Sequence, residues 1–157
     1  MTAFLPEPYT MRPARPDDAA ACLALRGLTR ENAISRADLA ARGITEESWR
    51  ADIGSGRLPG YVCCDAGGIV GYCFGDRETG EVVVLALLPG HEGKGLGKAL
   101  LSRVAEHLHG LGFRRLFLEA SADPVSRSHG FYRHLGWQPT GEAAGHGDEV
   151  LALFLAP

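Results

Sequence analysis

The sequence of 157 residues lacks the marks of several protein classes. It has no long basic run and a formal net charge of −3, so no nucleic-acid partner is expected. No apolar stretch is long enough to cross a membrane, because the apolar run at residues 82–88 is followed at once by Pro89, and no membrane partner is expected. The first ten residues have neither the basic start nor the apolar core of a signal peptide. A cytoplasmic protein is therefore predicted.

Cysteine and histidine are present without the spacings that bind metals or form redox pairs. Cys22, Cys63, Cys64 and Cys73 contain no C-x-x-C pair, which favours reduced thiols in the core. The six histidines show no H-E-x-x-H or similar pattern, so no metal is expected.

The chain also lacks linkers, repeats and low-complexity segments. With 45% apolar and 22% charged residues it has the composition of an ordinary globular protein. Its length is sufficient to bury one core, which predicts a single domain over residues 1–157 with a loose tail at residues 1–8.

The most informative stretch runs from Glu81 to Leu101. Residues 82–88 (VVVLALL) are apolar at every position, which predicts a strand buried on both faces. Three alternating glycines, at 93, 95 and 97, follow, and residues 98–110 then show the apolar spacing of a helix. A helix N-terminus reached through glycines presents bare N–H groups and a positive dipole end. The stretch therefore predicts a site for a phosphorylated ligand.

Two common phosphate loops do not fit this stretch. A Walker A loop needs a glycine where Glu92 stands, six residues before Lys98, and a Ser or Thr where Ala99 stands. The dinucleotide fingerprint G-x-G-x-x-G needs a spacing that Gly93, Gly95 and Gly97 do not have.

The remaining pattern, a strand followed by E-G-K-G-L-G-K, resembles the pyrophosphate-binding motif of the GNAT superfamily of N-acetyltransferases, Gln/Arg-x-x-Gly-x-Gly/Ala. Gly95 and Gly97 match that motif, and Glu92 stands where Gln or Arg is usual. The downstream segment 131–137 (FYRHLGW) is similar to the family's F-Y-x-x-x-G-F segment. Two motifs in the family's order, with a strand between them, identify the chain as a member of this superfamily.

The pattern of elements predicts an α+β protein, and the resemblance implies the GNAT fold. Residues 82–88 and 115–120 flank a helix, so these two strands should be parallel. We expect a mixed central sheet of about six to seven strands with helices on both faces. Predicted strands are 9–14, 61–65, 69–74, 82–88, 115–120, 137–142 and 149–155; predicted helices are 20–28, 45–56, 98–110 and 123–135, with 29–44 irregular. Asp17 is the predicted cap of the first helix, and Asp123 with Pro124 the predicted start of the last.

The resemblance implies that acetyl-CoA is the co-substrate and places its parts. Its pantetheine arm would bond to the backbone of Leu87 and Leu88, although plain core packing also explains these leucines. Its pyrophosphate would lie on the amides of Gly93, Lys94, Gly95, Leu96, Gly97 and Lys98, and Arg127 or Lys94 could meet the ribose phosphate. A carboxylate beside a pyrophosphate is repulsive, so Glu92 is expected to point to solvent while the two lysines supply compensating charge.

Two residues are candidates for proton transfer. Tyr132, in the F-Y segment, would protonate the departing thiolate, since a phenol with a pKa of about 10 is protonated at neutral pH; the alternative is a tyrosine that only packs in the core. Glu81, at the head of the central strand, would accept a proton from the amine through water; the alternative is a solvated carboxylate, with Glu78 and Glu119 as lesser candidates. Val125 and Ser128 stand where the family commonly has Asn and Ala.

The function implied is transfer of an acetyl group from acetyl-CoA to a primary amine, by direct attack in a ternary complex. A small molecule is the expected acceptor. The alternatives are a protein or peptide amine, and a module of the same fold that binds acyl-CoA without turnover. A homodimer is possible.

Overall fold

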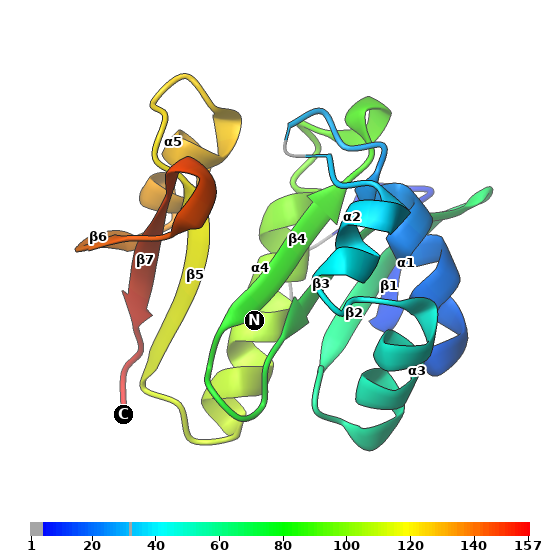
Figure 1. Cartoon of the computed structure of the whole chain (residues 1–157), viewed down its shortest axis with the longest axis horizontal. Coiled ribbons are helices and arrows are strands. Elements are labelled where there is room, and N and C mark those ends of the chain that lie inside the picture. The colour runs from blue at the N-terminus through cyan, green and yellow to red at the C-terminus, as the bar shows by residue number, and fades with distance from the viewer. Residues whose placement is uncertain (1–4, 32) are drawn as a thin grey trace.

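A computed structural model describes residues 5–31 and 33–157 (Figure 1). Residues 1–4, half of the predicted tail, lie outside the described residues. The other half is not entirely loose, because Leu5 packs against the core.

In the described part of the chain, seven strands form two sheets, which agrees with the predicted number of strands. The first sheet is antiparallel with the order β1 (Thr10–Pro13), β2 (Gly60–Asp65), β3 (Gly68–Gly75) and β4 (Val82–Leu87). The second has the order β5 (Arg115–Ser121), β7 (Asp148–Phe154) and β6 (Gln138–Ala143). Within the described residues a single parallel bridge, between Glu81 and Phe117, joins the two sheets. The predicted parallel pair therefore starts together and then separates, as the green β4 and yellow β5 show in Figure 1.

An irregularity in β4 lies close to this separation. Phe74 pairs with Val84 and Gly75 with Val82, so Val83 is an extra residue on β4. A bulge of this kind bends a strand and increases its twist. We infer that the bulge helps to turn β4 away from β5 just beyond the bridge at Glu81.

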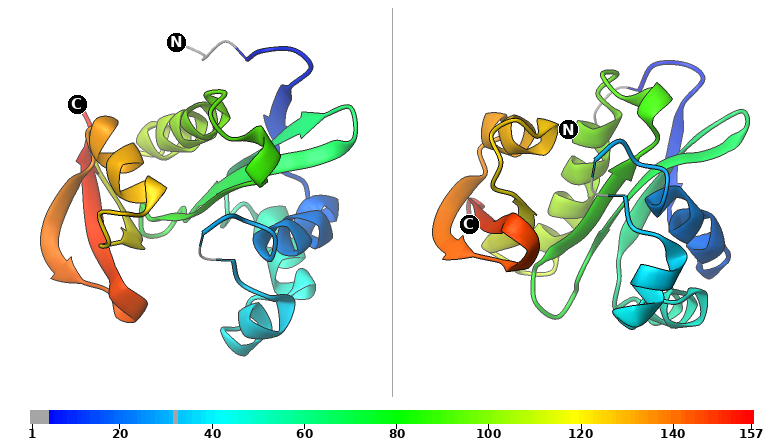
Figure 2. Two further views of the ribbon diagram at one scale, coloured as in Figure 1. Left: turned by 90° about the horizontal axis from the view of Figure 1, so that it is seen from above. Right: turned by 45° about the horizontal axis from the view of Figure 1, so that its top comes forward.

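Helices cover both faces of the first sheet, as predicted (Figure 2). α4 (Leu96–Gly110) packs on β2, β3 and β4 from one side, and its buried leucines join both sheets in the main core. α1 (Ala19–Arg26), α2 (Arg36–Ala41) and α3 (Glu46–Ser55) lie on the other side. Trp49 of α3 packs there against Phe74, with ring centroids 5.3 Å apart. Short 3-10 turns occupy Pro16–Asp18, Pro89–His91 and Gly145–Gly147.

Local signals identify some helix ends correctly. Thr45 caps α3 by accepting from the N–H of Ser48, and Gly56 ends that helix with a φ of 83°. The segment predicted as irregular contains α2, which Ser35 caps. Asp17 is not the cap of α1; it pairs with Arg50, and the neighbouring Asp18 instead accepts from Arg12 and from the Arg15 N–H.

The last helix begins later than predicted. α5 spans Arg127–His134, and Ser126 is its N-cap. Asp123 accepts instead from the N–H of Val125, which makes a turn before the helix. The Arg127 N–H donates to both carboxylate oxygens of Glu31, at 3.0 and 3.2 Å. A cap supplied by a side chain 96 residues away has no local sequence signal.

Candidate active site

The separation of β4 and β5 opens a cavity of about 540 Å³. Its walls come from both sheets, from α5, and from the segment between α1 and α3. The strand predicted over residues 82–88 is not buried on both faces, because Val83 is 38% exposed. Tyr132, Glu81 and Leu87 line this cavity, whereas Leu88 and residues 93–98 are not part of its lining.

Leu87 and Leu88 differ in the direction of their peptide groups. The Leu88 N–H donates to the Val70 carbonyl on β3, at 2.9 Å, and the Leu88 carbonyl accepts from the His91 N–H. Peptide groups of successive residues in a strand point to opposite edges. The N–H and C=O of Leu87 are therefore directed to the edge that faces β5, where an extended ligand could bond to them.

The glycine loop leads into α4 as predicted. Gly95 is the N-cap of α4 with a φ of 80°, and Gly93 has a φ of 77°. Side chains rarely adopt this left-handed conformation, so both positions favour glycine. Lys94 and Lys98 are exposed, while Leu96 is buried and holds the start of the helix against the core. The first-turn N–H groups have no helical acceptor, so the loop can receive an anion.

Glu92 does not point freely to solvent. Its Oε1 lies 2.7 Å from Nε of Arg30 and 3.5 Å from Nη1 of Arg127. Its side chain is only 20% exposed. Together with the Glu31 cap on Arg127, these contacts join the α1–α2 segment to both sides of the cavity. We call Arg30, Glu31, Glu92 and Arg127 the clasp.

Tyr132 is buried, and 9% of its surface is exposed. Its ring contacts Phe131 and Trp137 edge-on, with centroids 5.1 and 6.1 Å away. Burial raises the pKa of the Tyr132 phenol, and the positive charge of Arg26 opposes part of that rise. The phenol is therefore protonated at neutral pH. Tyr132 packs in the core and also lines the cavity, so its position is compatible with either interpretation of the sequence.

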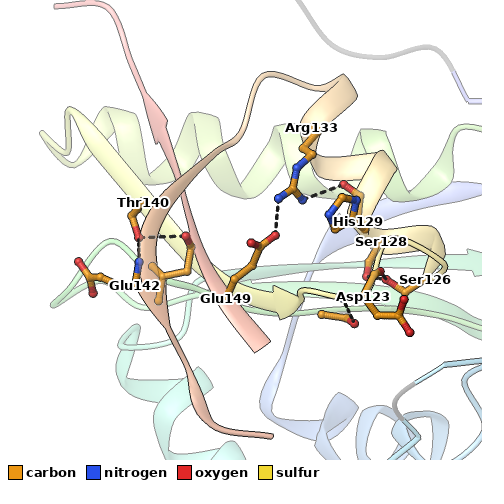
Figure 3. Close-up of polar contacts among 10 residues, drawn as sticks. Asp123, Ser126, Ser128, His129, Arg133, Thr140, Glu142 and Glu149 are labelled. Carbon is orange, nitrogen blue, oxygen red and sulfur yellow. Dashed lines mark hydrogen bonds and ion pairs between the residues drawn. The ribbon is translucent and has the colours of Figure 1, made fainter. Parts of the chain in front are cut away.

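α5, which carries Tyr132, is fixed to the second sheet (Figure 3). Arg133 donates to the carboxylate of Glu149 on β7, and its guanidinium also reaches the His129 carbonyl. Ser128 lines the cavity, whereas Val125 is 89% exposed on the turn before the helix.

Glu81 is half-buried at the head of β4. Burial raises the pKa of its carboxyl, and the negative charges of Glu119 and Asp76 raise it further. Glu81 and Glu119 both line the cavity, whereas Glu78 does not and lies 3.7 Å from Arg57. The structure thus brings Tyr132 and Glu81 to one cavity and separates Glu78 from them.

The four cysteines are free, and three of them are buried. Burial raises the pKa of Cys63 to about 11 and that of Cys22 to about 12, so these thiols stay protonated and are poor nucleophiles. The described residues contain no group of three or more His, Cys, Asp or Glu side chains that could hold a metal ion. In the same residues, no helix has the length and apolar character needed to cross a membrane.

Sequence reasoning missed several residues of the cavity. Arg26 at the end of α1, Arg30 and Glu31 after it, Arg42 after α2, and Trp49 in α3 all line it. Three of these five are arginines within 17 residues of one another, but nothing in their spacing indicates that the segment folds over β4.

Comparison with known proteins identifies the family. Residues 28–137 match the acetyltransferase (GNAT) family. The chain is 33% identical to a mycothiol acetyltransferase of Pseudarthrobacter chlorophenolicus over 150 residues, which is 86% of this chain and 44% of that protein. It is 35% identical over 69 residues to an amino-acid acetyltransferase of Pseudomonas aeruginosa, which is 44% of this chain and 15% of that protein. The chain therefore spans less than half the length of these curated relatives.

Solved structures agree on the fold. The PaiA N-acetyltransferase of Thermoplasma acidophilum, determined in complex with coenzyme A, superposes with a TM-score of 0.76 and covers 93% of this chain and 98% of its own, at 16% identity. The fold, the paired motifs and the family match lead to one conclusion: this chain belongs to the acetyltransferase (GNAT) family.

Proposed function

We propose that this chain transfers the acetyl group of acetyl-CoA directly to a primary amine of a small molecule. The observation that carries the proposal is the cavity where β4 and β5 separate, because it brings a protonated buried phenol, Tyr132, together with a carboxylate, Glu81. These are the two proton-transfer groups that the reaction needs, and family membership supplies the reaction class.

The residues present fit acetyl-CoA. The edge of β4 at Leu87 offers a peptide N–H and C=O to the pantetheine arm. The backbone of Gly93 to Lys98 offers N–H groups to the pyrophosphate, and an added Cβ at Gly93 or Gly95 would meet no atom within 4 Å, so the loop is open to a ligand. Lys94, Lys98 and Arg127 are the nearby cations for the phosphates. Leu88 follows the last residue of β4, and its N–H already donates to the Val70 carbonyl, so it offers no free N–H to the pantetheine arm.

The proposed reaction proceeds by deprotonation of the amine, attack on the thioester and departure of the thiolate. Glu81 accepts a proton from the ammonium group of the acceptor, through water, and leaves a neutral amine. The amine nitrogen attacks the thioester carbon, while a backbone N–H of β4 near Leu87 stabilises the developing oxyanion. The carbon–sulfur bond then breaks, and Tyr132 protonates the thiolate that departs. The nitrogen that attacked carries one excess proton, and this proton passes through water to the Tyr132 phenolate and restores the phenol. The products are the N-acetyl compound and the free thiol of coenzyme A.

The clasp supports a small acceptor. An ion pair from Arg30 to Glu92 and hydrogen bonds from the Arg127 N–H to Glu31 tie the α1–α2 segment across the cavity, which restricts the room for an extended peptide. The curated relatives reported above are named for small molecules, mycothiol and amino acids. Acetylation of a protein or peptide amine is the alternative, and a module that binds acyl-CoA without turnover is a second one.

A comparison of acceptors tests the proposal. The purified chain would be given acetyl-CoA with small primary amines or with short peptides, and release of the coenzyme A thiol would be followed. We expect release that depends on a small amine and falls sharply in Tyr132→Phe. Faster release with peptides would establish the first alternative. Acetyl-CoA binding without release by any amine would establish the second.

A further inference from the structure

Positive and negative side chains of the cavity lie on different walls. The four clasp residues neutralise one another as two arginines and two glutamates. The other two arginines of the lining, Arg26 and Arg42, lie on the side formed by α1, α2 and α3. On the strand side the lining includes Glu81 at the head of β4 and Glu119 on β5. The cavity is therefore positive on the helical wall and negative on the strand wall.

The positive wall brings the charges of Arg26 and Arg42 within electrostatic reach of each other, and Arg26 also donates to the Thr29 hydroxyl at 3.4 Å. Arg26 is partly buried, which lowers the pKa of its guanidinium, and the positive charge of Arg42 lowers it further. Two cations close enough to affect each other in a partly desolvated place repel, and an anion placed between them relieves that repulsion. A planar guanidinium matches a carboxylate in particular, because its N–H groups can donate to both carboxylate oxygens.

Arg26 is also close to the chemistry. It lies within electrostatic reach of the Tyr132 phenol, whose pKa its charge lowers. A ligand carboxylate held by Arg26 would thus lie in the part of the cavity that Tyr132 lines. The same wall carries an apolar surface, formed by Leu39, Ile44 and Trp49.

The opposite wall shows the complementary pattern. The negative charge of Glu119 raises the pKa of Glu81, which means that two carboxylates repel each other there. A cation such as an ammonium group relieves that repulsion. The cavity is consequently suited to a ligand with an ammonium group at one end and an anion at the other.

We propose that the acceptor is a primary amine that carries a carboxylate, of the amino-acid type, with the carboxylate bound by Arg26 and Arg42 and the amine directed to Glu81 and Glu119. Leu39, Ile44 and Trp49 contact its hydrocarbon part. This inference rests on the proposed acetyl transfer and adds the chemical class of the acceptor. It also assigns Arg26 and Arg42 a role in specificity.

Matched acceptors test the charge requirement. L-Leucine and L-phenylalanine would be compared with their amides and with isopentylamine and phenethylamine, which keep the hydrocarbon part and lose the carboxylate. The preferred spacing between amine and carboxylate would be found by comparing kcat/KM for glycine, β-alanine, 4-aminobutyrate and 5-aminopentanoate. We expect kcat/KM for the best carboxylate-bearing amine to exceed that of its carboxylate-free twin by about tenfold to a hundredfold, the range for hydrogen bonds to charged groups.

Variants test the residues. Arg42 is exposed, so Arg42→Gln should fold, and it should erase most of the preference by raising KM for the carboxylate-bearing amine far more than KM for its twin. Arg26→Lys keeps the charge but loses the planar donor pair, and it should weaken the preference. Arg50→Gln is the control, because Arg50 is an exposed arginine of α3 that pairs with Asp17 outside the cavity lining. It should leave the preference unchanged.

A binding experiment separates failure of this inference from failure of the proposed function. Calorimetric titration with N-acetyl-L-leucine and with its amide needs no turnover. Tighter binding of the acid that Arg42→Gln abolishes would support the inference even if no amine were acetylated. Equal binding of acid and amide, or equal acetylation of the paired amines, would overturn the carboxylate inference. Acetyl transfer to an amine without a carboxylate would remain the proposed function.

Discussion

The carboxylate of Glu92 lies 2.7 Å from the guanidinium of Arg30, a residue 62 positions earlier in the chain. The same oxygen lies 3.5 Å from Arg127 at the start of α5. Glu92 stands at the entrance to the glycine loop, where a carboxylate would repel a pyrophosphate. The two arginines offset that repulsion, and Glu92 in turn engages cations that could otherwise bind phosphate.

We therefore expect Glu92→Gln to bind acetyl-CoA more tightly. The change removes a negative charge beside the loop and releases Arg30 and Arg127 from their ion pairs. Calorimetry should show a Kd lower by about threefold to tenfold, in line with a partly exposed charge interaction. Glu46→Gln is the matched control, since Glu46 pairs with Arg36 at 3.5 Å and does not line the cavity. Weaker binding by Glu92→Gln would mean that the clasp serves the cofactor site.

Two loop glycines should respond differently to alanine. Gly95 has a φ of 80°, so Gly95→Ala strains the backbone and should lower the free energy of unfolding by about 1 kcal/mol. Gly97 lies inside α4, and an added Cβ would meet Phe131 at an ordinary 3.6 Å. Gly97→Ala should therefore stabilise the chain by up to about 1 kcal/mol.

The proposed pyrophosphate site predicts that both alanine variants lose acetyl-CoA affinity. Gly97→Ala is the more informative, because its loss cannot come from a weakened fold. Denaturant unfolding and acetyl-CoA titration would be measured on the same preparations. Unchanged affinity in Gly97→Ala would show that the ligand does not approach this position closely.

Tyr132→Phe should lower kcat by about a hundredfold or more while the Kd for acetyl-CoA stays near its original value. The phenol hydroxyl is lost, but the ring keeps its contacts with Phe131 and Trp137. Stopped-flow thiol release and calorimetry give the two quantities. A retained kcat would remove Tyr132 from the reaction and leave it as a core residue.

The carboxyl pair predicts a shift in pH dependence. Glu81 must be ionised to act as a base, so kcat should fall as the pH drops through its raised pKa. Glu119→Gln removes one of the negative charges that raise this pKa. The acidic limb of the profile should then move to lower pH. Glu106→Gln, on the exposed face of α4, should leave the limb in place. An acidic limb at the same pH in Glu119→Gln as in the original chain would exclude Glu81 as the titrating base.

The Arg12–Asp18 pair predicts a pH-dependent stability. Hydrogen bonds from Arg12, at 2.8 and 2.9 Å, and from the Arg15 N–H lower the pKa of Asp18 below its usual value. A lowered carboxyl pKa stabilises the fold above the unfolded pKa, and the effect is lost as the pH falls through the folded pKa. Asp18→Asn should lower the free energy of unfolding at pH 7 by about 2 kcal/mol.

The neighbouring residue provides the control for that prediction. Asp17 has a side chain that is 88% exposed and pairs with Arg50, so Asp17→Asn should change stability little. The difference between the original chain and Asp18→Asn should shrink below pH 4. Equal effects at Asp17 and Asp18, measured by urea unfolding across pH, would contradict the assignment.

The sequence predicts those parts of the site that depend on local chemistry. The glycine loop, the start of α4 and the position of Tyr132 follow from turn residues, apolar spacing and two motifs. The capping of α3 by Thr45 is likewise a matter of neighbouring residues. Each of these features is decided within a few positions along the chain.

The remaining features depend on segments that meet only in the folded chain. α5 begins at Arg127 rather than at the Asp123–Pro124 signal, and the carboxylate that caps Arg127 belongs to the distant Glu31. The clasp and the positive wall of the cavity arise because the segment after α1 folds over β4. Leu87 and Leu88 are adjacent and identical in residue type. Only the folded chain shows that the N–H of Leu88 already donates to the Val70 carbonyl.

The proposed reaction is direct transfer from acetyl-CoA to a small amine within one ternary complex. Its most direct test is the initial rate of thiol release while acetyl-CoA and a small amine are varied together. Direct transfer predicts double-reciprocal lines that intersect, with no acetylated protein when the amine is left out. Parallel lines together with an acetyl group on one of the four cysteines would contradict it.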